Sequence, residues 1–134
     1  MTGNSNLDSI IQNLSPDLRP DEYVFCTIKE AQYGDFSHIN PIASFTETEG
    51  LSLVISKANA DIEGLTYHGT FRCITLMVHS SLEAVGLTAI IATALARHQI
   101  SANVIAGYHH DHIFVPSIHA SSALDVLRSL NSTS

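Results

Sequence analysis

Three histidines and one aspartate fill four consecutive positions within GYHHDHIFVP, residues 107 to 116. Imidazole and carboxylate groups bind metal ions and exchange protons near neutral pH. In an extended chain His110 and His112 point to one face. His109 and Asp111 then point to the other, so at most two of these histidines converge unless the turn twists them together. Zinc needs three or four converging ligands, and neither H-E-x-x-H nor C-x-x-C is present. We predict no metal site here, only turn histidines that titrate near neutral pH.

A second group of candidate residues precedes a helical pattern, in HSSLEAVG, residues 79 to 86. A helix N-terminus presents unpaired N–H groups and a partial positive charge, which together favour a carboxylate. Gly86 would let a ligand approach the backbone without meeting a side chain. In the alternative interpretation Ser80 simply caps the helix, with Glu83 at the S-x-x-E spacing of a capping box, and Gly86 packs against a strand.

Asp111 could complete a binding site with this loop. At the tip of a hairpin an aspartate is ordinarily a turn residue, solvated or bonded to its own backbone. If it faces the helix N-terminus instead, its carboxylate can pair with an ammonium group while the helix end receives a carboxylate, so both charges of a zwitterion are met. Tyr108 could add an aromatic wall. The predicted ligand site comprises Ser80, Ser81, Val85, Gly86, Leu87, Tyr108 and Asp111.

Motifs for catalysis are missing from the sequence, which contains no G-x-S-x-G, Walker loop or G-x-G-x-x-G. Cys26 and Cys73 stand inside apolar runs, without a helix N-terminus to lower the pKa of their thiols. Ser80 beside His79 is not a triad signal, because neighbours on a strand point apart. We expect no catalytic residue, no cofactor and no enzymatic turnover.

Charge and composition limit the partners of the chain. Its 134 residues carry six basic and thirteen acidic side chains, a formal charge of −7 that has the wrong sign for binding nucleic acid. Charged residues are only 14% and hydrophobic residues 45%, which leaves a small monomer little charge to cover its apolar surface. This composition favours a homo-oligomer, in the simplest case a homodimer.

The same composition argues against a membrane or secreted protein. No apolar run approaches the ~18 residues that span a bilayer, and the first residues lack the pattern of a signal peptide. Two cysteines inside apolar runs are typical of buried free thiols in a reducing compartment. We expect a soluble cytoplasmic protein.

The candidate residues stand on a repeated order of elements. The first half predicts a lead-in helix over 7–14, strands over 22–28, 42–47, 51–56 and 66–71, an irregular crossover over 29–40 and a helix over 57–63. The second half predicts strands over 72–79, 103–108 and 111–115 and helices over 85–98 and 119–130. The second half repeats the first but lacks its last strand, and both match the split βαβ, or ferredoxin-like, arrangement.

This order predicts an α+β fold of two ferredoxin-like βαββαβ units in tandem, with antiparallel sheets and helices on one face. We place the N-terminal unit, with its lead-in helix, at residues 1–70. The C-terminal unit, which lacks its final strand, occupies residues 71–134. The vacant sheet position leaves an open edge that strand 22–28 or a second subunit could fill.

The segment FRCITLMVHSSLEAVGLTAIIATALARHQISANVIAGYHHDHIFVP, residues 71–116, closely resembles the second half of small tandem ACT-domain proteins. FTETEGLSLVI, residues 45–55, resembles their first half, and the resemblance runs from Leu7 to about Leu130. It implies βαββαβ modules that bind amino acids or other small effectors at interfaces between domains.

The C-terminal half is also similar to an ACT unit of animal cytosolic arginine sensors, through ISA, an aromatic residue and DH followed by an apolar strand ending in VP. This resemblance implies that Asp111 and the loop from Ser80 to Gly86 hold a free amino acid. One acidic residue of the sensors' loop is matched only by Ala84, with Glu83 adjacent, so specificity for arginine does not carry over.

Three functions follow from these patterns. The first is a non-enzymatic sensor that binds a small molecule, an amino acid, between ACT-like units. The alternative is a structural or protein-interaction module that docks through its open sheet edge and has no small ligand. The third, which the spacing favours least, is metal binding through His109, His110 and His112.

Overall fold

The computed structural model of the chain describes residues 6–132, and by packing it falls into two compact units. The central unit is Asp21–Phe71. The terminal unit joins the residues up to Pro20 to those from Arg72 onward. This is a division by packing, whereas the predicted halves, 1–70 and 71–134, are a division by repeated elements and remain a proposal.

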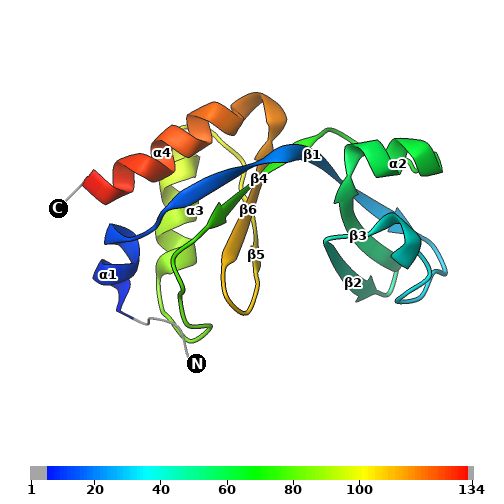
Figure 1. The fold of residues 1–134 in the computed structure, drawn as a ribbon, viewed down its shortest axis with the longest axis horizontal. Coiled ribbons are helices and arrows are strands. Elements are labelled where there is room, and N and C mark those ends of the chain that lie inside the picture. The colour runs from blue at the N-terminus through cyan, green and yellow to red at the C-terminus, as the bar shows by residue number, and fades with distance from the viewer. Residues whose placement is uncertain (1–5, 133–134) are drawn as a thin grey trace. The chain divides into compact units, whose positions relative to one another are not determined.

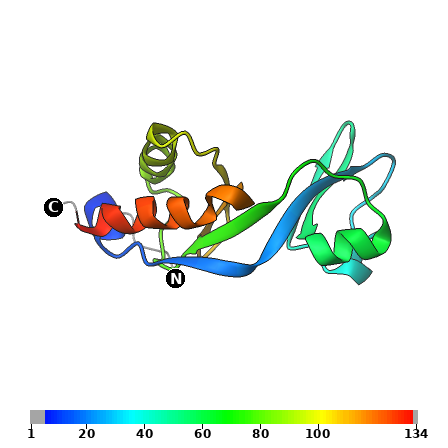
Figure 2. The same cartoon turned by 90° about the horizontal axis from the view of Figure 1, so that it is seen from above.

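The terminal unit packs helices on one antiparallel sheet. Its elements are α1 (Leu7–Gln12), the start of β1 (Pro16–Ile28), β4 (Phe71–Leu76), α3 (Leu87–Arg97), β5 (Asn103–Ala106), β6 (Asp111–Pro116) and α4 (Ala120–Ser132), which follows a 3₁₀ turn at Ser117–His119. The strands lie in the order β1-β4-β6-β5 (Figure 1). Figure 2 shows α3 and α4 on the same side of β1 and β4.

One buried apolar cluster joins the helices of the terminal unit to its sheet. Ile74 of β4, Ile91 of α3 and Leu127 of α4 are all fully buried in it. Ile10 and Leu14, which the lead-in segment contributes, belong to the same cluster. Within residues 6–132, no helix is long and apolar enough to cross a lipid bilayer.

The sheet position that the sequence left vacant is filled by the chain itself. The carbonyl of Ser15 accepts a hydrogen bond from the backbone N–H of Met77 at 3.1 Å. The carbonyl of Arg19 accepts two from the guanidinium of Arg72, at 3.1 and 2.7 Å. Because residue numbers rise along β1 as they fall along β4, this pairing is antiparallel. The first residues of β1 therefore supply the fourth strand of the terminal unit.

This finding corrects the expectation that strand 22–28 or a second subunit fills the vacant position. That part of β1 pairs with β3 of the central unit instead, from Tyr23 opposite Ser56 to Ile28 opposite Leu51. The sequence analysis began this strand at residue 22, but it also includes Pro16 and Pro20, since a proline is tolerated in a strand wherever its missing N–H is not needed for pairing. The strand consequently begins at Pro16 and runs for 13 residues.

The central unit carries its strands in the order β2-β3-β1. β2 (Ala43–Glu47) and β3 (Gly50–Ser56) form the predicted hairpin, with Glu47 opposite Gly50. Between β1 and β2 the chain is irregular, as predicted, apart from a 3₁₀ turn at Ser37–Ile39. The buried core of this unit comprises Val24, Cys26, Ile39, Leu51, Leu53, Ile55 and Ala60.

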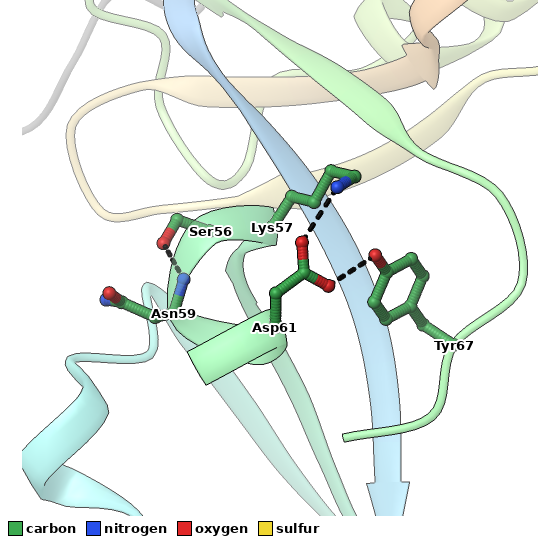
Figure 3. Close-up of polar contacts among 5 residues, drawn as sticks. All are labelled: Ser56, Lys57, Asn59, Asp61 and Tyr67. Atoms are coloured by element: carbon green, nitrogen blue, oxygen red, sulfur yellow. Dashed lines mark hydrogen bonds and ion pairs between the residues drawn. The ribbon is translucent and has the colours of Figure 1, made fainter. Parts of the chain in front are cut away.

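The helix of the central unit, α2 (Lys57–Glu63), lies where the sequence predicts it. The hydroxyl of Ser56 caps it by accepting a hydrogen bond from the backbone N–H of Asn59 at 3.1 Å. The carboxylate of Asp61 accepts from the Lys57 ammonium at 2.7 Å and from the Tyr67 hydroxyl at 2.6 Å (Figure 3). These two contacts, that with Lys57 first, lower the pKa of Asp61.

Residues 66–71 do not form the separate strand that the sequence predicts. After α2 the chain turns through Gly69, which has a φ of 73°, and the next strand begins only at Phe71. The β-favouring Tyr67 faces α2 through its bond to Asp61 instead of a neighbouring strand. One strand, β4, therefore replaces the two strands predicted over 66–71 and 72–79.

Gly50 has a backbone conformation that only glycine adopts without strain, with a φ of 152°. A Cβ atom at this position would lie 2.7 Å from the carbonyl oxygen of Ile28, which is backbone and cannot move aside cheaply. The start of β3 therefore requires a glycine, which has no Cβ atom, at position 50.

We expect Gly50→Ala to lower the free energy of unfolding by at least about 2 kcal/mol, from backbone strain together with the clash. Gly64→Ala is the matched control, because Gly64 also has a positive φ but no atom within 4 Å of its Cβ position. It should cost only about 1 kcal/mol. Urea denaturation of both variants measures their free energies of unfolding. If both variants lose the same amount, the predicted clash with Ile28 does not affect stability.

Candidate functional site

The two predicted parts of the ligand site lie beside each other in the terminal unit. β4 and β6 are sheet neighbours, so the loop that leaves β4 passes beside the start of β6. There the hydroxyl of Ser80 donates a hydrogen bond to Oδ2 of Asp111 at 3.1 Å. Ser80 is buried and Asp111 half-buried. The structure therefore brings together the loop and the carboxylate that the sequence analysis combined in one site.

The helix behind this loop begins later than its capping-box spacing suggests. α3 starts at Leu87, with Gly86 at the N-cap position and no side chain bonded to the helix end. Ser81 accepts a hydrogen bond from the backbone N–H of Glu83 at 3.1 Å, which makes a local turn rather than a cap. The alternative interpretation, a capping box of Ser80 and Glu83, is wrong, because both residues precede the N-cap position at Gly86. Within residues 6–132, no side chain caps the start of α3.

Gly86 does not open a path for a ligand as expected. Its φ of 99° is a left-handed conformation that favours glycine. A Cβ atom here would lie 3.2 Å from a methyl group of Leu7, so the space beside Gly86 is taken by helix α1. Glycine at this position serves backbone conformation and packing, against a helix and not against a strand.

The remaining predicted residues divide into an anchor and an exposed rim. Leu87 is buried in the apolar cluster and fixes the start of α3. Val85 is 84% exposed and Tyr108 64% exposed. Neither side chain encloses a pocket within the terminal unit. Tyr108 could form the expected aromatic wall of the ligand site only if another surface packed opposite it.

Under the first turn of α3 lies a narrow crevice. It is too tight to admit a water molecule, and Asp111 is the charged residue in its lining. The other lining residues are Leu76, Leu87, Thr88, Ile91, Val104 and Ile113. An amino acid cannot enter this crevice, so a ligand of Asp111 has to lie on its outer side.

The turn brings two histidines of the run together with a third from the loop. The ring centroid of His79 lies 4.8 Å from that of His110 and 5.7 Å from that of His109. Tyr108 packs edge-on against His109, with centroids 5.1 Å apart. Among residues 6–132, however, no group of three histidine, cysteine or acidic side chains is arranged to hold a metal ion. The geometry thus shows a cluster of aromatic and imidazole rings beside the site.

His112 stands apart from this cluster. Its Nδ1 lies 3.0 Å from the Thr75 hydroxyl, on the neighbouring strand. Burial lowers the pKa of His112, and the nearby charges of His110 and Arg19 lower it further. His112 is therefore a neutral hydrogen-bonded residue of the sheet and not a ligand residue.

Neither thiol is activated as a nucleophile. Cys26 and Cys73 are free and buried. Burial raises the pKa of each thiol, and a hydrogen bond with Thr75 offsets part of that effect for Cys73. A raised pKa keeps the reactive thiolate scarce at neutral pH.

The central unit contains a larger hollow that the sequence analysis did not anticipate. It measures about 520 Å³ and lies between the irregular crossover and the β2-β3 hairpin. The sequence of the crossover, residues 29–40, has no amphipathic period and so predicts no helix. A connection without a helix was the signal that part of the sheet stays uncovered. Its lining residues are Tyr33, Gly34, Phe36, Ser37, Asn40, Pro41, Ile42, Ala43, Ser44, Leu51 and Leu53.

Two family models match the chain, and both are described as ACT domains. One matches residues 2–72 and the other residues 70–129. A comparison with curated proteins found no match.

Solved structures show the same fold. A Vibrio cholerae protein of unknown function, described as a possible transport protein, is 50% identical, with a TM-score of 0.85 over 93% of this chain and 95% of that one. An Agrobacterium tumefaciens protein is 13% identical, with a TM-score of 0.72 over 87% of this chain and 88% of that one. The regulatory subunit of aspartate kinase from Thermus thermophilus is 10% identical, with a TM-score of 0.58 over 86% and 95% of the two chains. At such low identities the last two show the fold alone.

The lowered pKa of His112 links the stability of the fold to pH. The unfolded chain binds a proton near pH 6.5, but the folded chain binds it only at lower pH. Between these two values the unfolded state holds more protons, so the free energy of unfolding falls as the pH falls.

We expect His112→Asn to flatten this dependence between pH 7.5 and 5.5, because asparagine offers Thr75 a hydrogen-bonding partner but does not titrate. Chemical denaturation at both pH values measures the slope. His68→Asn, at an exposed histidine of the central unit, is the control and should leave the slope as it is. An unchanged slope in His112→Asn would contradict the assignment.

Proposed function

The chain belongs to the ACT-domain family, whose domains are regulatory and bind small ligands, and we propose that it is a non-enzymatic sensor of an amino acid. The carrying observation is the hydrogen bond between Ser80 and Asp111. It holds a carboxylate next to the loop that leads into α3, as the two-ended recognition of a zwitterion requires.

Asp111 is the proposed acceptor for the ammonium group. Only its Oδ2 atom is engaged by Ser80, and an ionised carboxylate can accept about four hydrogen bonds. Its half-buried position strengthens a charge-assisted bond relative to one in open solvent. Ser80 also fixes the orientation of the carboxylate, so less freedom is lost when a ligand binds.

The start of α3 is the proposed partner of the ligand carboxylate. The helix is 11 residues long, and in the part of the chain that the structure describes no side chain caps its start, so its first N–H groups can bind an anion. Ser81 lies in the same loop and can add its hydroxyl once a ligand is present. Val85 and Tyr108 supply apolar contact at the rim.

The ligand has to lie at the surface of the terminal unit, since the crevice beside Asp111 is too narrow for it. A surface site with an exposed rim is incomplete until a second ACT-like unit covers it. We propose that a second copy of the chain does so, in a homodimer, and that this cytoplasmic dimer reports ligand binding through its own assembly.

The second candidate function is a protein-interaction module without a small ligand. It is favoured by exposed apolar side chains on the loop after β4, where Leu82 is 64% and Met77 47% exposed. The sequence analysis suggested this function because it left a sheet edge open beside β4. In the structure β1 occupies that position, so the open edge no longer supports the function. A pull-down that recovers one stoichiometric protein partner, from material free of small molecules, would favour this second function.

Isothermal titration of the full chain with each of the twenty amino acids tests the sensor. We expect at least one to bind, and Asp111→Asn to weaken that binding roughly tenfold or more, the loss of one charge-assisted hydrogen bond. Asp125→Asn removes the same charge from an exposed position of α4 and should leave binding unchanged. The proposal fails if none of the twenty binds, or if both variants bind like the parent.

The proposed dimer makes a separate prediction. Native mass spectrometry of freshly purified protein should show a mass of two chains, with a small retained ligand that Asp111→Asn loses. If the protein is a monomer and still binds the amino acid, a second copy of the chain does not cover the site. Asp111 would remain the proposed acceptor for the ammonium group of the ligand.

A further inference from the structure

The hollow of the central unit exists because its first crossover lacks a helix. In the terminal unit, α3 connects β4 to β5 and covers the sheet through Leu87, Ile91 and Leu95. The corresponding connection in the central unit, between β1 and β2, contains only the 3₁₀ turn at Ser37–Ile39. The sheet residues Leu51 and Leu53 form the apolar floor of the space that remains.

The crossover that borders this hollow is held in place by its own contacts. Ile39 is buried in the core, and its carbonyl accepts a hydrogen bond from the side chain of Asn59 at 3.0 Å. The backbone N–H of Ile42 donates to the carbonyl of Val54 at 2.8 Å. Asp35 accepts from the backbone N–H of Gln32 at 2.7 Å. The hollow is therefore formed before any ligand arrives, which lowers the cost of binding.

The size and lining of the hollow fit a small molecule. Its volume of about 520 Å³ lies within the range of about 300 to 1,000 Å³ that ligand pockets occupy. Two aromatic side chains, Tyr33 and Phe36, stand on the crossover side. The side chains of Ser37, Asn40 and Ser44 line the same space. All three residues are exposed, and within the described residues no hydrogen bond engages their side chains, so a ligand can bond to their polar groups in place of water.

The charge of the lining decides which ligand fits. None of its residues carries a formal charge. The hollow is open, since Tyr33 is 83% and Ile42 49% exposed, so an ammonium or carboxylate group there would keep part of its hydration. It would meet no opposite charge in the lining, and the lining therefore offers it no charge-assisted contact. We infer that the hollow of the central unit is a second binding site, for an uncharged and partly aromatic small molecule that hydrogen-bonds through neutral groups. This site is separate from the zwitterion site proposed at Asp111 and does not rest on it.

Neutral aromatic fragments and their charged counterparts test this inference directly. Indole, benzamide and nicotinamide are titrated into the ¹⁵N-labelled full chain, and so are indole-3-acetate, benzoate and nicotinate. We expect at least one neutral fragment to shift the amide resonances of Gly34, Ser37, Asn40 and Ser44. Its charged counterpart should bind at least tenfold more weakly. No shift at these amides, or equal binding of the charged series, overturns the inference.

A pair of adjacent substitutions provides the matched variants. Ser44→Trp places an indole in the hollow from an exposed position of β2, so it should fold and abolish fragment binding. Phe45→Trp adds an indole on the opposite face of the same strand, where Phe45 is exposed, and should bind fragments as the parent does. Retained binding in Ser44→Trp overturns the site. A changed oligomeric mass in Ser44→Trp, with fragment binding intact, also overturns it and assigns the hollow to a contact between subunits.

Discussion

The backbone pairing between the first residues of β1 and β4 is the contact on which the terminal unit depends. It satisfies the carbonyl of Ser15, while the Arg72 side chain satisfies that of Arg19, and it occupies the edge of β4 that the second βαββα sequence leaves open. It also brings the preceding helix α1 to the core, where Ile10 and Leu14 are fully buried. The chain between the paired strands folds into the central unit, and the entropy cost of closing such a loop grows only slowly with its length. The terminal unit is thus completed by the two ends of the sequence.

The same pairing explains how the candidate amino acid site is built. Once β1 lies beside β4, Leu7 of α1 reaches Gly86 and fills the space beside it. β6 occupies the other side of β4, so Asp111 lies against the loop that contains Ser80. The start of α3 is therefore packed on one side by α1 and faces a carboxylate on the other. The exposed side of the proposed site is bordered by Val85 and Tyr108.

The two candidate sites differ in the charge that they can accept. At Asp111 a half-buried carboxylate and an uncapped helix end offer opposite partial charges to one small molecule. In the hollow of the central unit the lining is neutral and offers a charged group no opposite charge. The repeat has thus diverged: one crossover forms a helix with a polarised end, and the other forms a loop above an apolar floor.

Sequence reasoning worked where a residue's neighbours along the chain decide its conformation. The hairpin around Gly50 and the helix Lys57–Glu63 were predicted at or near their observed bounds. It failed at the start of β1, predicted at residue 22 and observed at Pro16, because whether a strand can include Pro20 depends on whether its partner needs the missing N–H. Glu83 suggested a capping box, yet the helix starts only after Gly86. The spacing of Ser80 and Glu83 matches a capping box, but the backbone N–H of Glu83 bonds to Ser81 in a turn ahead of the helix.

The sequence by itself determined most of the order of the elements, and the resemblance of residues 45–55 and 71–116 to ACT-domain proteins determined the family. It also proposed, without settling, that Asp111 and the loop from Ser80 bind a zwitterion. The order of the elements depends on side-chain periodicity and residue type, which are local properties. Only the tertiary structure decided that residues from Pro16 onward complete the terminal sheet, that Leu7 closes the space beside Gly86, and that a hollow remains in the central unit. The physical reason is that every residue except proline offers the same backbone N–H and C=O groups, so the choice of strand partner becomes visible only when distant segments pack together.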